Sequence, residues 1–255
     1  MKITNSLHFV KWMVVAGTCF GSLNLPAQII SINVAAFATD VQQIDTSETY
    51  GVLSLGSVVG GWKNTGSYTL TDVAFSDGSP STVDMTILGP GGLNSAAAGY
   101  NNTPMKGFVA DYTTTPTPTS LTLSQINASF ASGYLAIVYL SGFNLNRGAS
   151  ITDGTSTFFY QPVDFTVNTW NGTLVQTTTT TDLGSGNAPV AQYAVFGSSS
   201  SPLTANSITF TLDTLYGGGA GIGGVQLVAV PEPSAALTGL LGVGLFILSQ
   251  RKYRI

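Results

Sequence analysis

The sequence contains one cysteine and one histidine, Cys19 and His8, and both lie within its first 20 residues. If this segment is removed as a secretory signal, the mature chain keeps no thiol, no imidazole and no disulfide. Catalysis by a Ser-His-Asp or Cys-His arrangement is then excluded, as is a zinc site made of histidine or cysteine. We therefore expect a protein without enzymatic activity.

Charged side chains are also scarce, at 8% of the 255 residues, whereas soluble domains average about 25%. Between residues 28 and 230, three cations (Lys63, Lys106 and Arg147) face eleven carboxylates, which gives this span a net charge of −8. Such a surface repels phosphate backbones, so we do not expect nucleic acid as a partner. The apolar content of 44% argues against disorder.

Residues 1–27 have the features of a secretory signal peptide. Two lysines give a positive start, residues 10–20 are mostly apolar, and a small residue precedes the predicted cleavage after Ala27. Cleavage after Ala38 also fits the small-residue rule, but it would remove an apparent strand. Acylation of Cys19, as in lipoproteins, is a further alternative, although the residues before it match that pattern poorly.

Residues 230–255 form three parts in a fixed order. A proline-rich motif comes first, then an apolar run over residues 235–248, then a basic tip. The motif is Val230, Pro231, Glu232, Pro233 and Ser234, and the tip is Arg251, Lys252 and Arg254. A permanent membrane span usually needs about 20 residues, and this run is shorter. It still predicts a short transmembrane helix, with the basic tip on the cytoplasmic side. A buried helix with a basic solvent-exposed end is the alternative.

This three-part pattern closely resembles the PEP-CTERM sorting signal of exported bacterial proteins. The segment also carries the label ice-binding-protein C-terminal domain, which is not by itself a sign of ice binding. The resemblance implies recognition by an exosortase, a membrane protease or transpeptidase of Gram-negative bacteria. It further implies a transient anchor in the inner membrane, removal of the tail, and delivery to the outer surface or an extracellular polysaccharide matrix.

Residues 28–229 predict an all-β domain, an antiparallel β-sandwich or jelly roll. Segments 82–88 and 206–215 place apolar residues at alternate positions, which is typical of strands with one buried face. Segment 133–140 is apolar on both faces, as in a strand that is covered on both sides. In segment 66–75 the alternation changes phase at Asp72, as at a β-bulge.

The body of the chain resembles exported PEP-CTERM proteins that have a galactose-binding-like jelly roll. The resemblance lies in ISINVA near the start and in segments 58–67, 133–140 and 220–228. The likeness covers most of residues 29–230 and contains no catalytic signature. It implies that the first and last strands of the domain lie near each other.

The candidate ligand-binding residues are Trp170, Asn171 and Asp153. An aromatic ring can stack on the C–H face of a sugar, while amide and carboxylate groups bind its hydroxyls. A core position is an equally good interpretation of Trp170, and it is the favoured interpretation of Trp62. A carbohydrate-binding module is therefore one alternative function. A glycan-active enzyme that uses paired aspartates is another, with no catalytic residue assigned.

Several weaker motifs are similar to ligand sites. Loops at Asp77, Asp153 and Asp182 offer oxygen atoms to calcium, but Asp-Gly is also a common turn, so no metal ligand or cofactor is assigned. Residues 219–224 match G-x-G-x-x-G, yet a strand follows them, which favours a glycine turn between strands over a nucleotide site. The sequence has no regular Thr-x-Thr repeat, so it does not predict an ice-binding face. We expect an exported surface or matrix protein with a structural or adhesive role.

Overall fold

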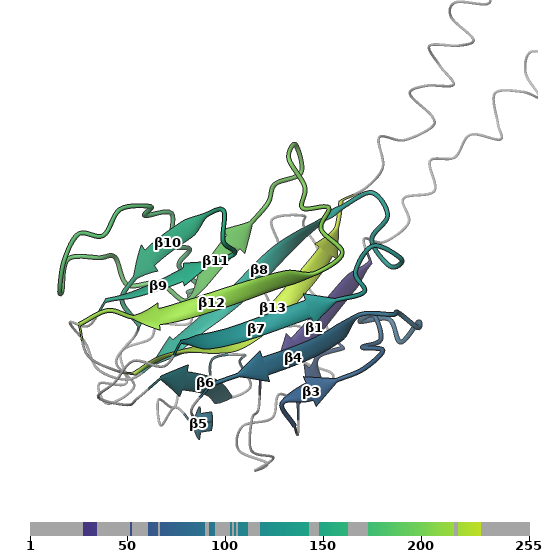
Figure 1. The fold of residues 1–255 in the computed structure, drawn as a ribbon, viewed down its shortest axis with the longest axis horizontal. Helices are drawn as coiled ribbons and strands as arrows, with labels where there is room; N and C mark the ends of the chain where they lie inside the picture. The colour runs from purple at the N-terminus through teal and green to yellow at the C-terminus, as the bar shows by residue number, and fades with distance from the viewer. Residues whose placement is uncertain are drawn as a thin grey trace, which may run out of the picture. The chain divides into compact units, whose positions relative to one another are not determined.

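Two β-sheets make up the part of the chain that the computed structural model describes (Figure 1). The described residues are 28–34, 52, 61–65, 67–89, 92–94, 103, 105, 107–111, 118–142, 148–162, 173–216 and 219–230. None of these residues is in an α-helix, and residues 28–230 form one compact unit. The all-β class predicted from the sequence is confirmed.

The first sheet has seven strands, of which five follow the order β11-β8-β13-β1-β2. The strands are β1 (Ile29–Asn33), β2 (Lys63–Asn64), β5 (Gly92–Asn94), β6 (Gly107–Asp111), β8 (Tyr134–Gly142), β11 (Tyr193–Phe196) and β13 (Ala220–Ala229). Strand β6 pairs with the start of β13, and β5 pairs with β6. All of these pairs are antiparallel except β1 with β2.

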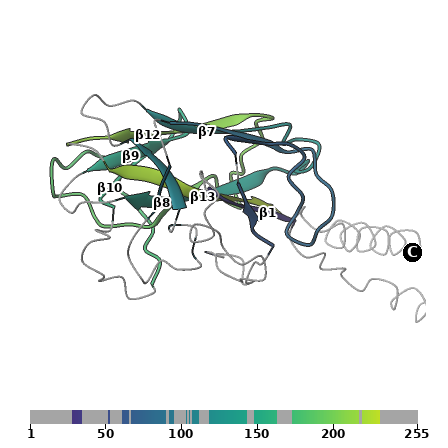
Figure 2. The ribbon, with the colours of Figure 1, turned by 90° about the horizontal axis from the view of Figure 1, so that it is seen from below.

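The second sheet has six antiparallel strands in the order β10-β9-β12-β7-β4-β3. The strands are β3 (Thr69–Leu70), β4 (Asp84–Leu88), β7 (Thr119–Ser124), β9 (Ala149–Thr152), β10 (Thr157–Tyr160) and β12 (Ile208–Thr214). Among these strands, the chain changes sheet after β2, β4, β6, β7, β8, β10, β11 and β12. Figure 2 shows the two sheets as stacked layers.

The strands form where side chains alternate between core and solvent. In β4, Met85 and Ile87 are buried, whereas Thr86 between them is exposed. Strand β12 alternates in the same way, and this confirms the periodicity of both segments. All nine residues of β8 are buried, as predicted for a strand that is covered on both faces.

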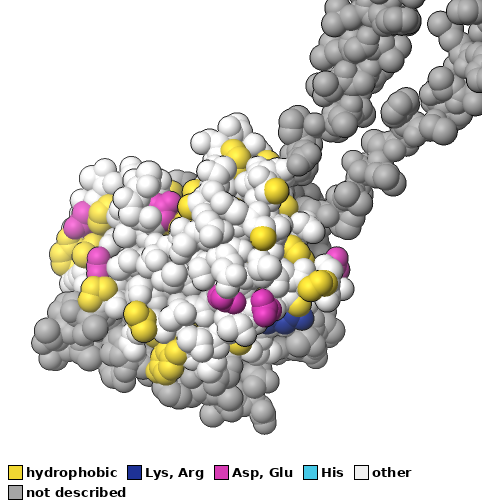
Figure 3. Space-filling model, turned by 45° about the vertical axis from the view of Figure 1, so that its right-hand side comes forward, with side chains coloured by type: hydrophobic (Ala, Val, Ile, Leu, Met, Phe, Trp, Pro, Cys, Tyr) yellow, Lys and Arg dark blue, Asp and Glu magenta, His cyan; other side chains and the backbone are white. Residues whose placement is uncertain are grey.

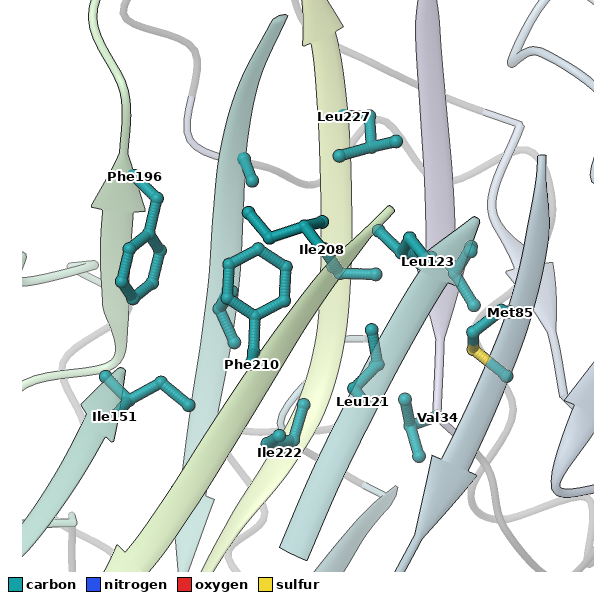
Figure 4. Close-up of a cluster of buried hydrophobic side chains, with 14 of the residues drawn as sticks. Val34, Met85, Leu121, Leu123, Ile151, Phe196, Ile208, Phe210, Ile222 and Leu227 are labelled. Atoms are coloured by element: carbon teal, nitrogen blue, oxygen red, sulfur yellow. The ribbon is translucent and has the colours of Figure 1, made fainter. Parts of the chain in front are cut away.

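The apolar core lies between the two sheets and draws side chains from both (Figure 4). Phe210 of β12 faces Phe196 of β11 with ring centroids 4.9 Å apart, and Phe158 of β10 packs edge-on against Phe196 at 5.3 Å. Aromatic pairs in this geometry contribute about 0.5–1.5 kcal/mol beyond the burial of their area. They join the two layers at the end of the core where β10 and β11 lie.

The first and last strands of the described domain are neighbours, as the family resemblance implied. Strand β1 pairs with β13 over its whole length, from Ile29 opposite Val228 to Asn33 opposite Gly224. On its other edge β13 pairs with β8, and the register shifts between Ile222 and Gly224. The G-x-G-x-x-G residues therefore lie in and just before a bulged strand, so the prediction of a glycine turn between strands was wrong. Glycines in a strand mark bulges and close backbone approach.

The change of phase at Asp72, predicted as a β-bulge, lies just after β3, which ends at Leu70. Leu70 lies opposite Met85, and three residues after Leu70 the Val73 amide donates to the Val83 carbonyl at 2.8 Å. The segment after β3 therefore has one residue more than the segment opposite it between these two pairings. Asp72 occupies the extra position with a φ of 49°, which few residues other than glycine, asparagine and aspartate adopt readily.

The outer face of the first sheet carries a buried network of polar side chains. The Tyr139 hydroxyl donates to the Gln226 amide oxygen at 2.6 Å and accepts from the Val52 amide at 2.7 Å. Gln226 in turn donates to the Ser31 hydroxyl at 2.9 Å. Burial raises the pKa of Tyr139, so its hydroxyl stays protonated and able to donate.

Trp62 covers this network and is fully buried, as favoured from the sequence. Its ring meets the Tyr139 ring edge-on at 5.6 Å. Gly61 precedes it with a φ of 74°, and a Cβ at this position would lie 2.2 Å from the Ser76 carbonyl oxygen. Glycine is thus required for the chain to bring Trp62 over the sheet.

We predict that Tyr139→Phe lowers the free energy of unfolding by about 1–3 kcal/mol, because Val52 and Gln226 each lose a partner in a buried site. Urea denaturation followed by circular dichroism would measure the change. Tyr216→Phe is the matched control, since the exposed Tyr216 hydroxyl also has a hydrogen bond, to Asp182. A loss no larger for Tyr139→Phe than for this control would contradict the importance of the network.

Candidate functional site

A groove of about 380 Å³ lies beside strand β12. One wall is the turn between β9 and β10, and the other is the segment that leads into β12. Its floor includes outward-facing threonines of β12. The lining residues are Thr152, Asp153, Gly154, Thr155, Leu203, Ala205, Ser207, Ile208, Thr209 and Thr211. Of the three candidate ligand-binding residues, Asp153 thus lies at a concave site.

Asp153 shapes the turn in which it lies. Its Oδ1 atom accepts hydrogen bonds from the backbone amides of Thr155 at 2.9 Å and Ser156 at 2.7 Å. Gly154 follows with a φ of 86°, so the residues Asp-Gly form a tight turn, the alternative weighed for this motif. The second carboxylate oxygen, Oδ2, has no hydrogen-bond partner among the described residues. It can accept a hydrogen bond from a ligand hydroxyl in the groove.

Tyr134 lies close behind the groove. Its hydroxyl donates to the Ala205 carbonyl at 3.0 Å, and its backbone pairs with Leu203. Burial, together with the negative charge of Asp153, raises the pKa of Tyr134 to about 12. The tyrosine therefore stays neutral at ordinary pH, and it fixes the segment that forms one wall of the groove.

The other candidate residues are only partly placed. Trp170 and Asn171 lie outside the described residues, so Asp153 is the one predicted ligand-binding residue whose surroundings the structure describes. Val230 is the only described residue of the sorting motif, and its amide donates to the Gly133 carbonyl at 3.0 Å. The rest of the motif, Pro231 to Ser234, the apolar run, the basic tip and the signal peptide also lie outside the described residues.

Asp77 and Asp182, which could offer oxygen atoms to calcium, accept hydrogen bonds from other groups of the protein. Asp77 accepts from the hydroxyl and the amide of Ser79, and these two bonds lower its pKa. Asp182 accepts from the Tyr216 hydroxyl at 2.7 Å and from the Gly184 amide, which lower its pKa in the same way. Within the described ranges, no three acidic, histidine or cysteine side chains come together as a metal site.

Sequence reasoning missed most of the groove. Its walls come from segments that are distant along the chain, residues 152–155 and 203–207. A usable signal was present in segment 206–215, where the polar residues between Ile208, Phe210 and Leu212 are threonines. The alternation shows that these threonines point outward, but it does not indicate which loop covers them.

We predict that Asp153→Ala lowers the free energy of unfolding by about 1 kcal/mol, because two turn amides lose their acceptor. Asp153→Asn keeps an oxygen at the same position and is expected to cost much less. Chemical denaturation of both variants tests this. Equal losses would mean that the negative charge, and not the turn hydrogen bonds, is what the fold requires.

No helix among the described residues is long and apolar enough to cross a membrane. Comparisons with protein-family models, with curated proteins and with solved structures gave no match to this chain.

Proposed function

We propose that this chain is an exported bacterial protein of the cell surface or extracellular polysaccharide matrix, with a structural or adhesive and non-enzymatic role. An exosortase-type protease recognises its C-terminal signal while the apolar run anchors it in the inner membrane. Removal of the tail then releases the β-domain to its destination. The three-part pattern of residues 230–255 is the basis of the proposal.

The main supporting observation is the point at which the fold ends. Strand β13 stops at Ala229, whose amide donates to the Gln28 carbonyl at 2.9 Å, and the sorting motif begins at the next residue. Gln28 directly follows the expected signal cleavage after Ala27. The two processing signals therefore adjoin the paired ends of one domain. Losing both would remove nothing from the core between the sheets, whose described residues span Ile30 to Leu227.

Two exposed aspartates support a non-enzymatic role. Paired carboxylates in glycosidases need one group with a raised pKa. Asp77 and Asp182 are exposed and have lowered pKa values, because hydrogen bonds from Ser79 to Asp77, and from Tyr216 and Gly184 to Asp182, stabilise the charged form. These groups act as turn-forming residues, consistent with a domain built for structure and adhesion.

We further infer that the two sheets form a jelly-roll sandwich. The alternation of β7, β8, β9, β11, β12 and β13 between the sheets supports this, as does the pairing of β1 with β13. The second candidate function is carbohydrate binding at the groove beside Asp153, since its carboxylate and surrounding hydroxyls suit a sugar.

The test compares the full chain in an exosortase-containing bacterium and in the same strain with the exosortase gene deleted. We expect the intact strain to release a protein that has lost its C-terminal tail, and the deletion strain to keep the full tail in the inner membrane. Mass spectrometry and cell fractionation measure both. The same mass and location in the two strains would contradict the proposal.

Glu232→Ala should block tail removal, because the substitution alters the centre of the motif. Glu48→Ala is the matched control, since Glu48 and Glu232 are the two glutamates of the chain. Normal processing of Glu232→Ala, or equal loss of processing in both variants, would show that the motif is not what the protease reads.

A further inference from the structure

The outer face of the second sheet carries hydroxyl side chains aligned across its strands. Cross-strand pairing places one row along Thr69, Thr86, Thr122 and Thr209. A second row runs along Ser120, Thr211, Thr152 and Thr157. We call these eight residues the hydroxyl face. The sequence lacks a Thr-x-Thr repeat because the rows run across the strands rather than along any one of them.

Pairing partners in neighbouring strands point to the same side of a sheet. The residues between them, such as Met85, Leu121 and Phe210, are buried in the core, so the hydroxyl face points away from it. In Figure 3, most of the visible described surface is white, which marks backbone and side chains that are neither charged nor hydrophobic.

Many of these hydroxyls are available to a ligand. Thr69, Thr86 and Thr209 are exposed, and Ser120 and Thr211 are half-buried. The hydroxyls of Thr69, Thr86, Ser120 and Thr211 have no hydrogen-bond partner among the described residues. Thr122 and Thr209 bond each other at 2.9 Å, which keeps their row continuous and leaves further bonding capacity on both oxygens. Thr152 is different, because its hydroxyl already bonds within its own turn.

The spacing of the rows fits an extended glycan. Neighbouring strands lie about 4.8 Å apart, close to the length of one pyranose unit, so successive sugars can each meet a hydroxyl on the next strand. Leu88 precedes Ser120 in the second row and is 64% exposed, which offers an apolar contact to the C–H face of a sugar. Toward the other end of this row, Thr211 and Thr152 also line the groove beside Asp153.

The charges of this sheet select the kind of glycan. Its six strands contain no lysine or arginine, and their two charged side chains are Asp84 and Asp213. Both lie half-buried on the outer face, in β4 and β12. An acidic polysaccharide would be repelled by these carboxylates and would find no cation on the strands. A neutral chain, rich in hydroxyls, suits the surface.

We infer that the hydroxyl face is a binding surface for a neutral polysaccharide chain, which lies across the strands and ends in the groove beside Asp153. The inference rests on the proposed surface or matrix role, since it assigns that role a ligand class. It places the binding surface on a sheet, whereas Trp170 and Asn171 had suggested a loop site.

The test uses the full chain, purified in a zwitterionic detergent because alkyl-glycoside detergents carry sugar headgroups. Pull-down with insoluble cellulose, and affinity electrophoresis in gels containing galactomannan, dextran or the acidic polymer alginate, measure binding. We expect saturable binding to at least one of the three neutral polymers and markedly weaker binding to alginate at low salt. Purified protein makes this result independent of tail processing in cells, so the two proposals can fail separately.

Substitutions then locate the binding surface. Thr86→Arg combined with Thr211→Arg places one bulky side chain on each row and should weaken binding at least about tenfold. Thr178→Arg is the matched control, because Thr178 is an exposed threonine outside the hydroxyl face, and it should leave binding within about twofold. Thr86→Val with Thr211→Val keeps the β-branched shape, removes one hydroxyl from each row, and should weaken binding a few-fold even if the arginine variant folds poorly.

Three results would overturn the inference. The first is no binding to any of the three neutral polymers. The second is binding that both the arginine pair and the valine pair leave unchanged, which would place the site elsewhere, such as the loops that bear Trp170. The third is alginate binding as strong as that of the neutral polymers, which would contradict selection by charge.

Discussion

The tertiary structure depends on the pairing of β13 within the first sheet. This strand joins β8 along one edge and both β1 and β6 along the other, and none of these partners precedes it closely in the sequence. The first sheet therefore remains incomplete until the last residues of the domain are available. Non-local pairing of this kind carries a loop-closure cost before its contacts stabilise the fold. In its pairing with β8, the register of β13 shifts between Ile222 and Gly224, where the other edge of β13 changes partner from β6 to β1.

The two outer faces of the domain are used in opposite ways. On the first sheet, Trp62 covers the hydrogen-bonded chain through Tyr139 and Gln226, so the polar groups satisfy one another away from water. On the second sheet, the hydroxyl face stays open and lacks cations. A face that keeps its polar groups uncovered is the one free to meet a partner.

The sequence predicted individual strands better than their arrangement. Alternation identified β4 and β12, and apolar residues on both faces identified β8, because each pattern depends on a local period. The hydroxyl face escaped prediction since Thr86, Thr122 and Thr209 become neighbours only through pairings between distant segments. Asp153 was identified as a site residue for its chemistry, yet its groove depends on Leu203 and Ala205, which no local pattern connects with it. The prediction of a turn at residues 219–224 was wrong because glycine is typical both of turns and of bulged strands.

If the protein has the proposed adhesive role, a surface of hydroxyls limits the free energy with which one domain binds one glycan. Each neutral hydrogen bond to a sugar contributes about 0.5–1.5 kcal/mol net, because water bonds both partners beforehand. Several such bonds must also offset the entropy lost on association, so one domain on one short glycan binds weakly. A long polysaccharide presents the same repeat many times, and many copies of the protein in one matrix then hold it by multivalency. Weak, repeated and uncharged contacts suit retention in a matrix better than tight capture of a single ligand.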